Sequence, residues 1–247
     1  MAIYLPEGLS MAAFLGVVGA SFLGSFITVA FGIGGGVFVI TVMASLVPPT
    51  ALIPVHGVVQ LFSNATRVAL FARHIRFNAI KWVLGGTLVG CLIGGVISVE
   101  LPPQLVLGGL GVFVLWTVLA KPPRWLRELP FVSGAISAFL TMFFGATGMF
   151  VAAFTKSLNL DRQAHTATHA TIMTVQHLIK VLVFGVLGFT FSDWIFVILS
   201  MVVAGVLGTA IGKRVLLKLS DHLFKRLLDI VLIALSLRLI WLAFTGQ

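Results

Sequence analysis

The chain has 247 residues, of which 59% are hydrophobic and only 9% are charged, and its formal net charge is +9. This composition excludes a water-soluble globular protein, because most of the surface must face an apolar medium. The basic residues lie in short segments between apolar runs, so we expect a lipid bilayer as the partner and no nucleic acid.

Apolar segments fill nearly the whole chain and leave no room for a soluble domain. The segments are residues 11–31, 36–47, 51–72, 78–99, 103–120, 131–144, 149–158, 164–188, 193–212 and 222–244. No basic stretch precedes the first segment and no small-residue cleavage site follows it, so we expect it to be retained rather than removed as a signal peptide. The single cysteine, Cys91, lies in an apolar segment, where we expect it to pack.

Three segments, 36–47, 131–144 and 149–158, are too short to cross a bilayer, which takes roughly 20 residues. They flank two glycine-rich breaks, residues 32–36 (Gly-Ile-Gly-Gly-Gly) and 145–148 (Gly-Ala-Thr-Gly). Non-helical backbone inside a membrane is tolerated where protein or a cavity surrounds it. The pattern therefore predicts two re-entrant helical hairpins and six full spans.

Basic residues are divided unequally between the two predicted sides of the membrane. With both termini outside, the outer loops carry Glu7, Glu100 and Asp193 but no Lys or Arg. This distribution follows the positive-inside rule and predicts a multi-pass protein of a bacterial-type inner membrane with periplasmic termini. The basic residues at the inner side are Arg73, Arg76, Lys81, Lys121, Arg124, Arg127, Lys156, Arg162, Lys213, Arg214, Lys218, Lys225 and Arg226.

The same topology makes the first hairpin open outward and the second inward, each followed by three spans. Residues 26–35 resemble residues 139–148, and residues 58–64 resemble residues 174–180. We therefore predict an all-α polytopic membrane protein with an inverted-topology repeat, in which each half is a re-entrant hairpin plus three transmembrane helices.

This organisation divides the chain into two membrane repeats, residues 1–120 and 131–247, with a cytoplasmic linker at 121–130. Small residues recur in each half at spacings that let helices approach closely. They are Gly86, Gly90, Gly94, Gly205, Gly208, Thr209 and Gly212.

Three motifs carry a resemblance to a known family: residues 31–36 (FGIGGG), the weaker counterpart 144–148 (FGATG) and residues 54–64 (PVHGVVQLFSN). They resemble the TauE/SafE family of sulfite exporters, also called toluene sulfonate uptake permeases. The resemblance extends over the whole chain and implies transport of sulfite, sulfonates or related organosulfur anions by two homologous halves. Thr147 and Met149 depart from the glycine-rich pattern, which leaves open whether both breaks contribute equally.

Polar side chains concentrate in the two segments that follow the hairpins, residues 51–72 and 164–188, and form one helical stripe in each. Polar groups inside lipid are costly and often functional. An inverted repeat would bring both stripes and both breaks together near the bilayer midplane. The predicted substrate-binding residues are Gly34, Gly35, His56, Gln60, Asn64, Arg67, Thr147, Gly148, His169, Gln176 and Lys180.

The charges in the predicted spans favour an anionic substrate. Arg67, Lys180 and Arg238 lie in spans, whereas the only carboxylate there, Asp229, lies near the inner edge. Helix N-termini after the glycine turns also favour anions. Lys180 is the strongest candidate, because it lies about 12 Å from the outer end of its span.

Structural roles compete with these assignments. Arg67 and Arg238 can extend to the headgroups. His56 and His169 can bond to backbone carbonyls, and Gln60 and Gln176 can join neighbouring helices.

We expect a secondary transporter that works by alternating access and exports a small anion such as sulfite, a sulfonate or another organosulfur or carboxylate anion. The chain has no P-loop, and an inside-negative potential favours anion exit. The alternative is a gated anion channel or a membrane subunit of a larger transport system. Without a His-Glu-x-x-His motif or a cysteine-based haem site we expect no enzyme and no cofactor. The sequence allows a homodimer without indicating one.

Overall fold

The computed structural model describes residues 5–31, 34–98, 102–120, 123, 128–145, 147–215 and 221–245. Every regular element in this part of the chain is a helix, as predicted. The α-helices are α1 Met11–Phe31, α2 Gly35–Ala44, α3 Pro49–Phe71, α4 Phe77–Ser98, α5 Pro103–Leu119, α6 Pro130–Phe144, α7 Gly148–Ser157, α8 Arg162–Val186, α9 Ile195–Val215 and α10 Asp221–Thr245. Two short 3₁₀ helices are η1 Ala72–His74 and η3 Phe191–Trp194.

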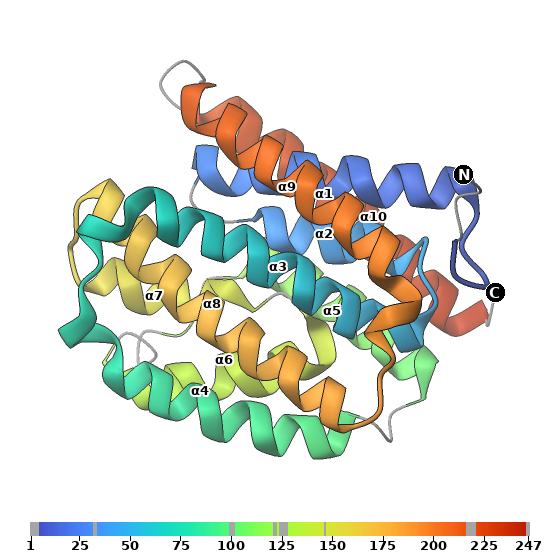
Figure 1. Cartoon of the computed structure of the whole chain (residues 1–247), viewed down its shortest axis with the longest axis horizontal. Coiled ribbons are helices and arrows are strands. Elements are labelled where there is room, and N and C mark those ends of the chain that lie inside the picture. The colour runs from blue at the N-terminus through green and yellow to red at the C-terminus, as the bar shows by residue number, and fades with distance from the viewer. Residues whose placement is uncertain are drawn as a thin grey trace.

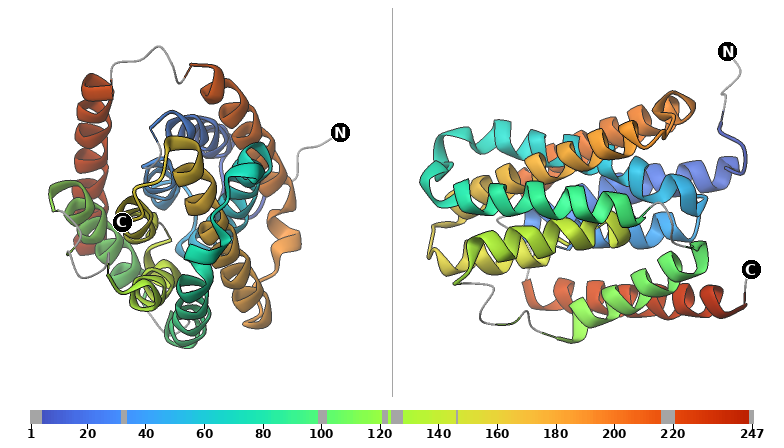
Figure 2. Two further views of the ribbon diagram at one scale, coloured as in Figure 1. Left: turned by 90° about the vertical axis from the view of Figure 1, so that its left-hand side faces the viewer. Right: turned by 90° about the horizontal axis from the view of Figure 1, so that it is seen from below.

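The central pair of helices is α3 and α8, which pack side by side through the bundle (Figure 1). Helix α4 packs against α6 and α8, and α9 packs in a matching way against α1 and α3. Helices α5 and α10 pair along one side of the bundle (Figure 2). The helices that follow the two predicted hairpins therefore meet at the centre.

The first hairpin consists of α1 and α2. Gly34 has φ 100°, a left-handed conformation that favours glycine. Gly35 begins α2 against α1, where an added Cβ atom would meet the carbonyl oxygen of Gly24 and the hydroxyl of Thr28. Residues 32 and 33 of the predicted break lie outside the described residues.

The second hairpin consists of α6 and α7, which turn at Gly145 with φ 72°. Ser133 Oγ donates to the carbonyl of Phe150, 3.2 Å away, and Ser137 Oγ donates to the carbonyl of Thr147, also 3.2 Å away. Helix α7 has 10 residues, so it extends only about 15 Å. Residue 146 lies outside the described residues.

Four of the described helical stretches are long and apolar enough to cross a membrane: Met11–Val29, Ile80–Ile97, Gln163–Val186 and Phe191–Arg214. The first one lies in α1, whose bounds match the predicted apolar segment 11–31, so this arm of the first hairpin is long enough to cross the membrane by itself. Helix α3 also has 23 residues, but with its polar stripe it is not among these four stretches. The count of six full spans therefore stays a prediction.

Predicted close-packing glycines join two pairs of helices. An added Cβ atom at Gly90 of α4 would meet the carbonyl oxygen of Ala135 in α6. One at Gly208 of α9 would meet the carbonyl oxygen of Phe22 in α1. The structural role predicted for these residues is confirmed.

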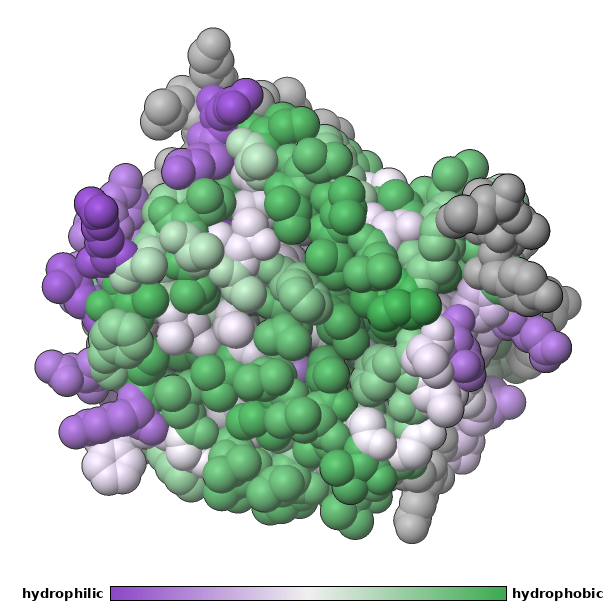
Figure 3. Space-filling view, viewed as in Figure 1, coloured by the Kyte–Doolittle hydropathy of each residue, from purple (hydrophilic) through white to green (hydrophobic). Residues whose placement is uncertain are grey.

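Basic residues gather at one end of the bundle, which we call the basic end; there α3, α7 and α9 end and α4 and α8 begin. The backbone N–H of Arg76 donates to Thr168 Oγ1 at 3.2 Å, and Lys213 Nζ lies 5.4 Å from the ring centroid of Phe71. In Figure 3 hydrophobic residues cover the middle of the visible face and hydrophilic residues gather at its two ends. The exposed basic residues at this end are Arg73, Arg76, Lys81, Lys156, Lys213, Arg214 and Arg226.

At the other end, which we call the opposite end, α1, α3 and α5 begin and α4, α8 and α10 end. The predicted outer residues Glu7 and Asp193 lie there. Some charged residues of the predicted topology lie outside the described residues: Glu100, Lys121, Arg124, Arg127 and Lys218.

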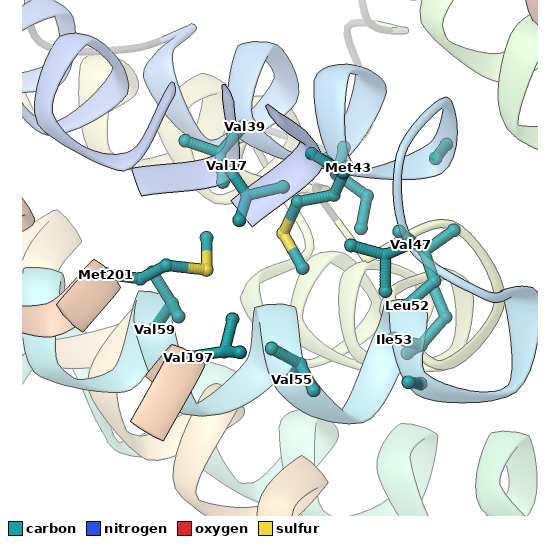
Figure 4. Close-up of a cluster of buried hydrophobic side chains, with 14 of the residues drawn as sticks. Val17, Val39, Met43, Val47, Leu52, Ile53, Val55, Val59, Val197 and Met201 are labelled. Atoms are coloured by element: carbon teal, nitrogen blue, oxygen red, sulfur yellow. The ribbon is translucent and has the colours of Figure 1, made fainter. Parts of the chain in front are cut away.

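The largest apolar core lies between α1, α2, α3 and α9. Val39 and Met43 of α2 pack there with Val17 of α1, Val55 of α3 and Met201 of α9 (Figure 4). A smaller core between α4 and α6 contains Cys91, whose thiol is free and buried. The predicted packing role of Cys91 is confirmed.

Candidate functional site

The polar stripes of α3 and α8 are buried inside the bundle. The two helices pack against each other, so the stripes lie at the centre of the molecule. The buried polar side chains are His56, Gln60, Ser63, Asn64 and Arg67 on α3, and Thr168, His169, Gln176, His177 and Lys180 on α8.

Two histidines, one on α3 and one on α8, each contact a backbone carbonyl of the hairpin that precedes their helix. His56 Nε2 lies 3.2 Å from the carbonyl oxygen of Gly36, and His169 Nε2 lies 3.1 Å from that of Gly148. The predicted bonding of both histidines to backbone carbonyls is thereby confirmed. His56 Nδ1 is buried without a hydrogen-bond partner, so one nitrogen of this ring is not committed to the fold.

Lys180 lies at the second glycine break. Its side chain is 0% exposed, and Nζ donates to the carbonyl oxygen of Gly145 at 3.4 Å. Its Cε atom lies beside Gly57 of α3, where an added Cβ atom would be 2.9 Å away. Lys180 therefore points into the bundle and bridges the second hairpin to α3.

The second break also contacts the first half of the chain. An added Cβ atom at Gly145 would lie 2.9 Å from Cδ1 of Ile40 in α2 and 3.2 Å from Nδ1 of His56. His56 in turn contacts Gly36 at the start of α2. One histidine thus lies between the two hairpins.

Gln176 belongs to a network with α6 and α7. Ser137 Oγ donates to Gln176 Oε1 at 3.2 Å, and Gln176 Nε2 donates to Thr147 Oγ1 at 3.2 Å. Thr147 Oγ1 donates to the carbonyl of Ser137 at 2.7 Å. Gln176 therefore joins helices, the structural role that the sequence left open for it.

Arg67 lies nearer the basic end and is only 2% exposed. Its Nη2 atom donates to Asn64 Oδ1 at 2.8 Å and its Nε atom to the carbonyl of Ser63 at 3.3 Å. Asn64 Nδ2 donates to the carbonyl of Gln60 at 2.7 Å. Arg67 does not extend to the headgroups but folds back along its own helix.

The predicted site residues lie at different levels of the α3–α8 interface. Gly57 marks the level of Lys180 on α3, and Arg67 follows ten residues later, about 15 Å along the helix. Gly35 faces α1, so its missing side chain serves packing of the hairpin. Arg238, by contrast, is exposed on α10.

Some residues of the site were missed by the sequence analysis. Gly57 and Ser137 carry no charge and follow no motif that marks them as contacts of Lys180 and Gln176. Gly145 was recognised only as part of a break, because the direction of a carbonyl leaves no trace in a sequence.

No Asp or Glu occurs in helices α1 to α9; all seven acidic residues lie in connecting segments, in η3 or in α10. The buried cations therefore have no carboxylate on the helices around them. Neither Gly34 nor Thr147 caps its helix with a side chain, because glycine has none and the Thr147 hydroxyl bonds to Ser137. The described residues contain no group of three His, Cys, Asp or Glu side chains that could hold a metal ion.

A cavity of about 300 Å³ lies toward the opposite end; Lys180, His56 and Gly145 do not line it, but near neighbours of each in the chain do. Three lining residues are close in the chain to polar groups of the site. Pro54 lies two residues before His56, and Phe143 lies two residues before Gly145. Phe184 lies one helical turn after Lys180. The lining residues, mostly apolar, are Pro49, Thr50, Ile53, Pro54, Pro103, Val106, Met142, Phe143, Phe184, Leu187, Gly188 and Phe189.

Apolar helices around a buried, polar and cationic centre define a multi-pass membrane protein. The chain belongs to the sulfite exporter TauE/SafE family, whose family model matches residues 17–239. This is a family of transporters, as the sequence motifs predicted. No curated protein and no solved structure matches the chain.

Proposed function

We propose that the protein is a secondary carrier that exports small sulfur-containing anions, such as sulfite or a sulfonate, across a bacterial-type inner membrane. The observation that carries the proposal is Lys180, a fully buried ammonium group with no carboxylate on the helices around it, one helical turn from Phe184 in the lining of a cavity. An unpaired charge inside a membrane protein is costly and marks a functional site. An anion that enters the cavity supplies the missing counter-charge.

The site offers an anion several donors. The Nζ atom of Lys180 has three N–H donors, of which Gly145 takes one. His56 Nδ1 lies beside the same glycine and is a donor only when the ring carries a second proton, because Nε2–H already donates to Gly36. The uncapped N-terminus of α2 carries backbone N–H groups and the positive end of a helix dipole. These groups suit an oxyanion better than a cation.

Paired contacts support an inverted repeat. His56 bonds to Gly36, and His169 bonds to Gly148. The two histidines are 113 positions apart in the chain, and the two glycines are 112 positions apart. Ser25 bonds to Ser63 at 3.0 Å, as Ser137 bonds to Gln176. In this class of fold one half moves against the other to expose a central site alternately.

The positive-inside rule assigns the basic end to the cytoplasm. The cavity then faces the periplasm, which corresponds to an outward-facing state. Its lining residues come from the opposite end of the bundle and from the tip of the second hairpin, and none comes from the basic end, which favours one-sided access over a continuous pore. An inside-negative potential contributes about 2.3 kcal/mol per charge per 100 mV to anion exit.

The proposal is tested by counterflow of sulfite in proteoliposomes and by thermal shift with sulfite, sulfate, thiosulfate, sulfonates and carboxylates. We expect saturable exchange and stabilisation by one class of anion. Lys180→Met should lose the exchange and reduce the stabilisation, whereas Lys81→Met, which removes an exposed cation, should keep both. Conductance without saturation would instead indicate a channel. Absence of both binding and flux for all these anions would refute the proposal.

A further inference from the structure

We infer that Arg67 forms a second anion-binding station, separate from Lys180 and nearer the basic end. The inference rests on the proposed function and adds to it a two-station path along the α3–α8 interface.

The two cations are too far apart to hold one small anion. The guanidinium of Arg67 folds back to the level of Ser63 and Asn64, whereas Lys180 lies at the level of Gly57. Six to seven residues of helix separate these levels, which corresponds to about 10 Å. All oxygens of a sulfite ion lie on one sulfur atom, so one ion cannot contact both groups.

Arg67 has no counter-ion on the helices around it. Its two hydrogen bonds go to neutral acceptors on its own helix and use two of its five N–H donors. Helices α1, α2, α5, α6, α8 and α9 pack against α3 and contain no acidic residue. Asp193 of η3 lies at the other end of α3.

The groups that face this station are basic or neutral. His169 of α8 interacts electrostatically with Arg67 and with Lys156 of α7, and His177 also interacts with Arg67. Planar guanidinium groups bind oxyanions with two parallel hydrogen bonds. A buried guanidinium group among basic neighbours therefore fits an anion that binds transiently during transport.

The position of Arg67 mirrors that of Lys180. The two residues are 113 positions apart, as are His56 and His169, whose contacts with the hairpins correspond. Arg67 lies four residues before the basic end of α3, and Lys180 lies six residues before the opposite end of α8. Each half thus supplies one cation, and each cation lies toward a different end of the bundle.

In this conformation the cavity lies on the Lys180 side of the bundle, with Phe184, one turn after Lys180, in its lining. We assign Lys180 to anion exchange with the opposite end and Arg67 to anion exchange with the basic end. An exported anion passes from Arg67 to Lys180 as the halves move.

Equilibrium binding of radiolabelled sulfite to the purified full-length protein tests the inference. We expect two sulfite ions per chain in the parent and in Lys81→Met, one in Lys180→Met and one in Arg67→Met. Arg67→Lys keeps the charge and should retain both sites, with the second weakened less than tenfold. If Arg67→Met does not fold, Arg67→Gln replaces it, with elution profile and melting temperature as the criteria for folding.

The outcomes separate the two proposals. One sulfite per chain in the parent, or two in a folded Arg67→Met or Arg67→Gln protein, would overturn the second station and leave the carrier intact. No sulfite bound to the parent would count against sulfite as the substrate and thus against the proposed function itself.

Discussion

The Nζ atom of Lys180 lies 3.4 Å from the carbonyl oxygen of Gly145, at the point where the second hairpin reverses direction. Gly145 needs its positive φ for this turn, and the turn aims its carbonyl at the lysine. The ammonium group is thus held by one neutral acceptor and retains donors for a ligand. A backbone turn and a buried cation act here as one unit.

Substitution of Gly57 by alanine should displace Lys180 and weaken anion binding. The new Cβ atom would lie 2.9 Å from Cε of Lys180, closer than carbon atoms normally approach. The flexible lysine side chain can shift, so we expect little loss of stability but a tenfold weaker sulfite affinity, about 1.4 kcal/mol. Titration of sulfite against the melting temperature measures the effect.

The matched control is Gly19→Ala, on an exposed face of α1 with no heavy atom within 4 Å of the new Cβ atom. It should leave sulfite affinity unchanged. Equal affinities for Gly57→Ala and the parent would show that the position of Lys180 does not matter.

Substitution of Lys180 by methionine should stabilise the protein in the absence of anions. The change removes a buried charge that has no carboxylate partner and keeps an unbranched apolar chain in its place. Replacement of buried ions by apolar residues is often stabilising, by about 1–4 kcal/mol. We expect a higher melting temperature than the parent without sulfite, and a smaller rise than in the parent when sulfite is added, because only the Arg67 station still binds the anion. A lower melting temperature would indicate that the ammonium group mainly supports the fold.

Much of the fold could be predicted because the deciding features are local. Glycines 34 and 145 interrupt apolar runs, and both breaks are turns at positive φ. The spacing of His56, Gln60 and Asn64 placed them on one helical face, and all three are buried. Helix α1 has the bounds of the predicted apolar segment, residues 11–31.

The finer geometry of the site depends on contacts that leave little trace in a sequence. Residues 58–64 and 174–180 share Val-Gln and suggest a shift of 116 positions between the halves, whereas the hydrogen bonds of His56 and His169 support 113. Only the second shift pairs Arg67 with Lys180. Their separation along the helices depends on side-chain direction, which periodicity alone does not give.

Substitution of Gly90 by alanine should destabilise the pairing of α4 with α6. The added Cβ atom would meet the carbonyl oxygen of Ala135, and a backbone atom cannot move aside as a side chain can. Overpacking of this kind costs about 1–3 kcal/mol. The control Gly185→Ala places its Cβ atom at an ordinary 3.7 Å from Phe191. Thermal unfolding in detergent should separate the two variants by several degrees, and equal melting temperatures would contradict the close approach.

Asp161 caps α8 at the basic end, and its contribution should depend on pH. Its Oδ1 atom accepts hydrogen bonds from the backbone N–H groups of Gln163 and Ala164, each at 2.9 Å. The bond from Ala164 is the main cause of a lowered pKa of this exposed carboxyl group, and nearby His74 and Arg76 add to it. A carboxylate with a lowered pKa in the folded state stabilises that state above the unfolded pKa, about 3.9, and loses this effect as the pH falls through the folded pKa.

Substitution of Asp161 by alanine should therefore lower the melting temperature at pH 7, since helix N-caps depend on a side-chain acceptor. The difference from the parent should shrink as the pH falls below about 3.9, where the parent carboxylate begins to take up its proton. Asp161→Asn keeps the hydrogen-bond acceptor without the charge. Its melting temperature at pH 7 should therefore lie between those of the parent and the alanine variant, and it should vary less with pH than that of the parent. A difference between parent and alanine variant that stays constant from pH 7 to pH 3 would show that the carboxylate charge contributes nothing to this helix end.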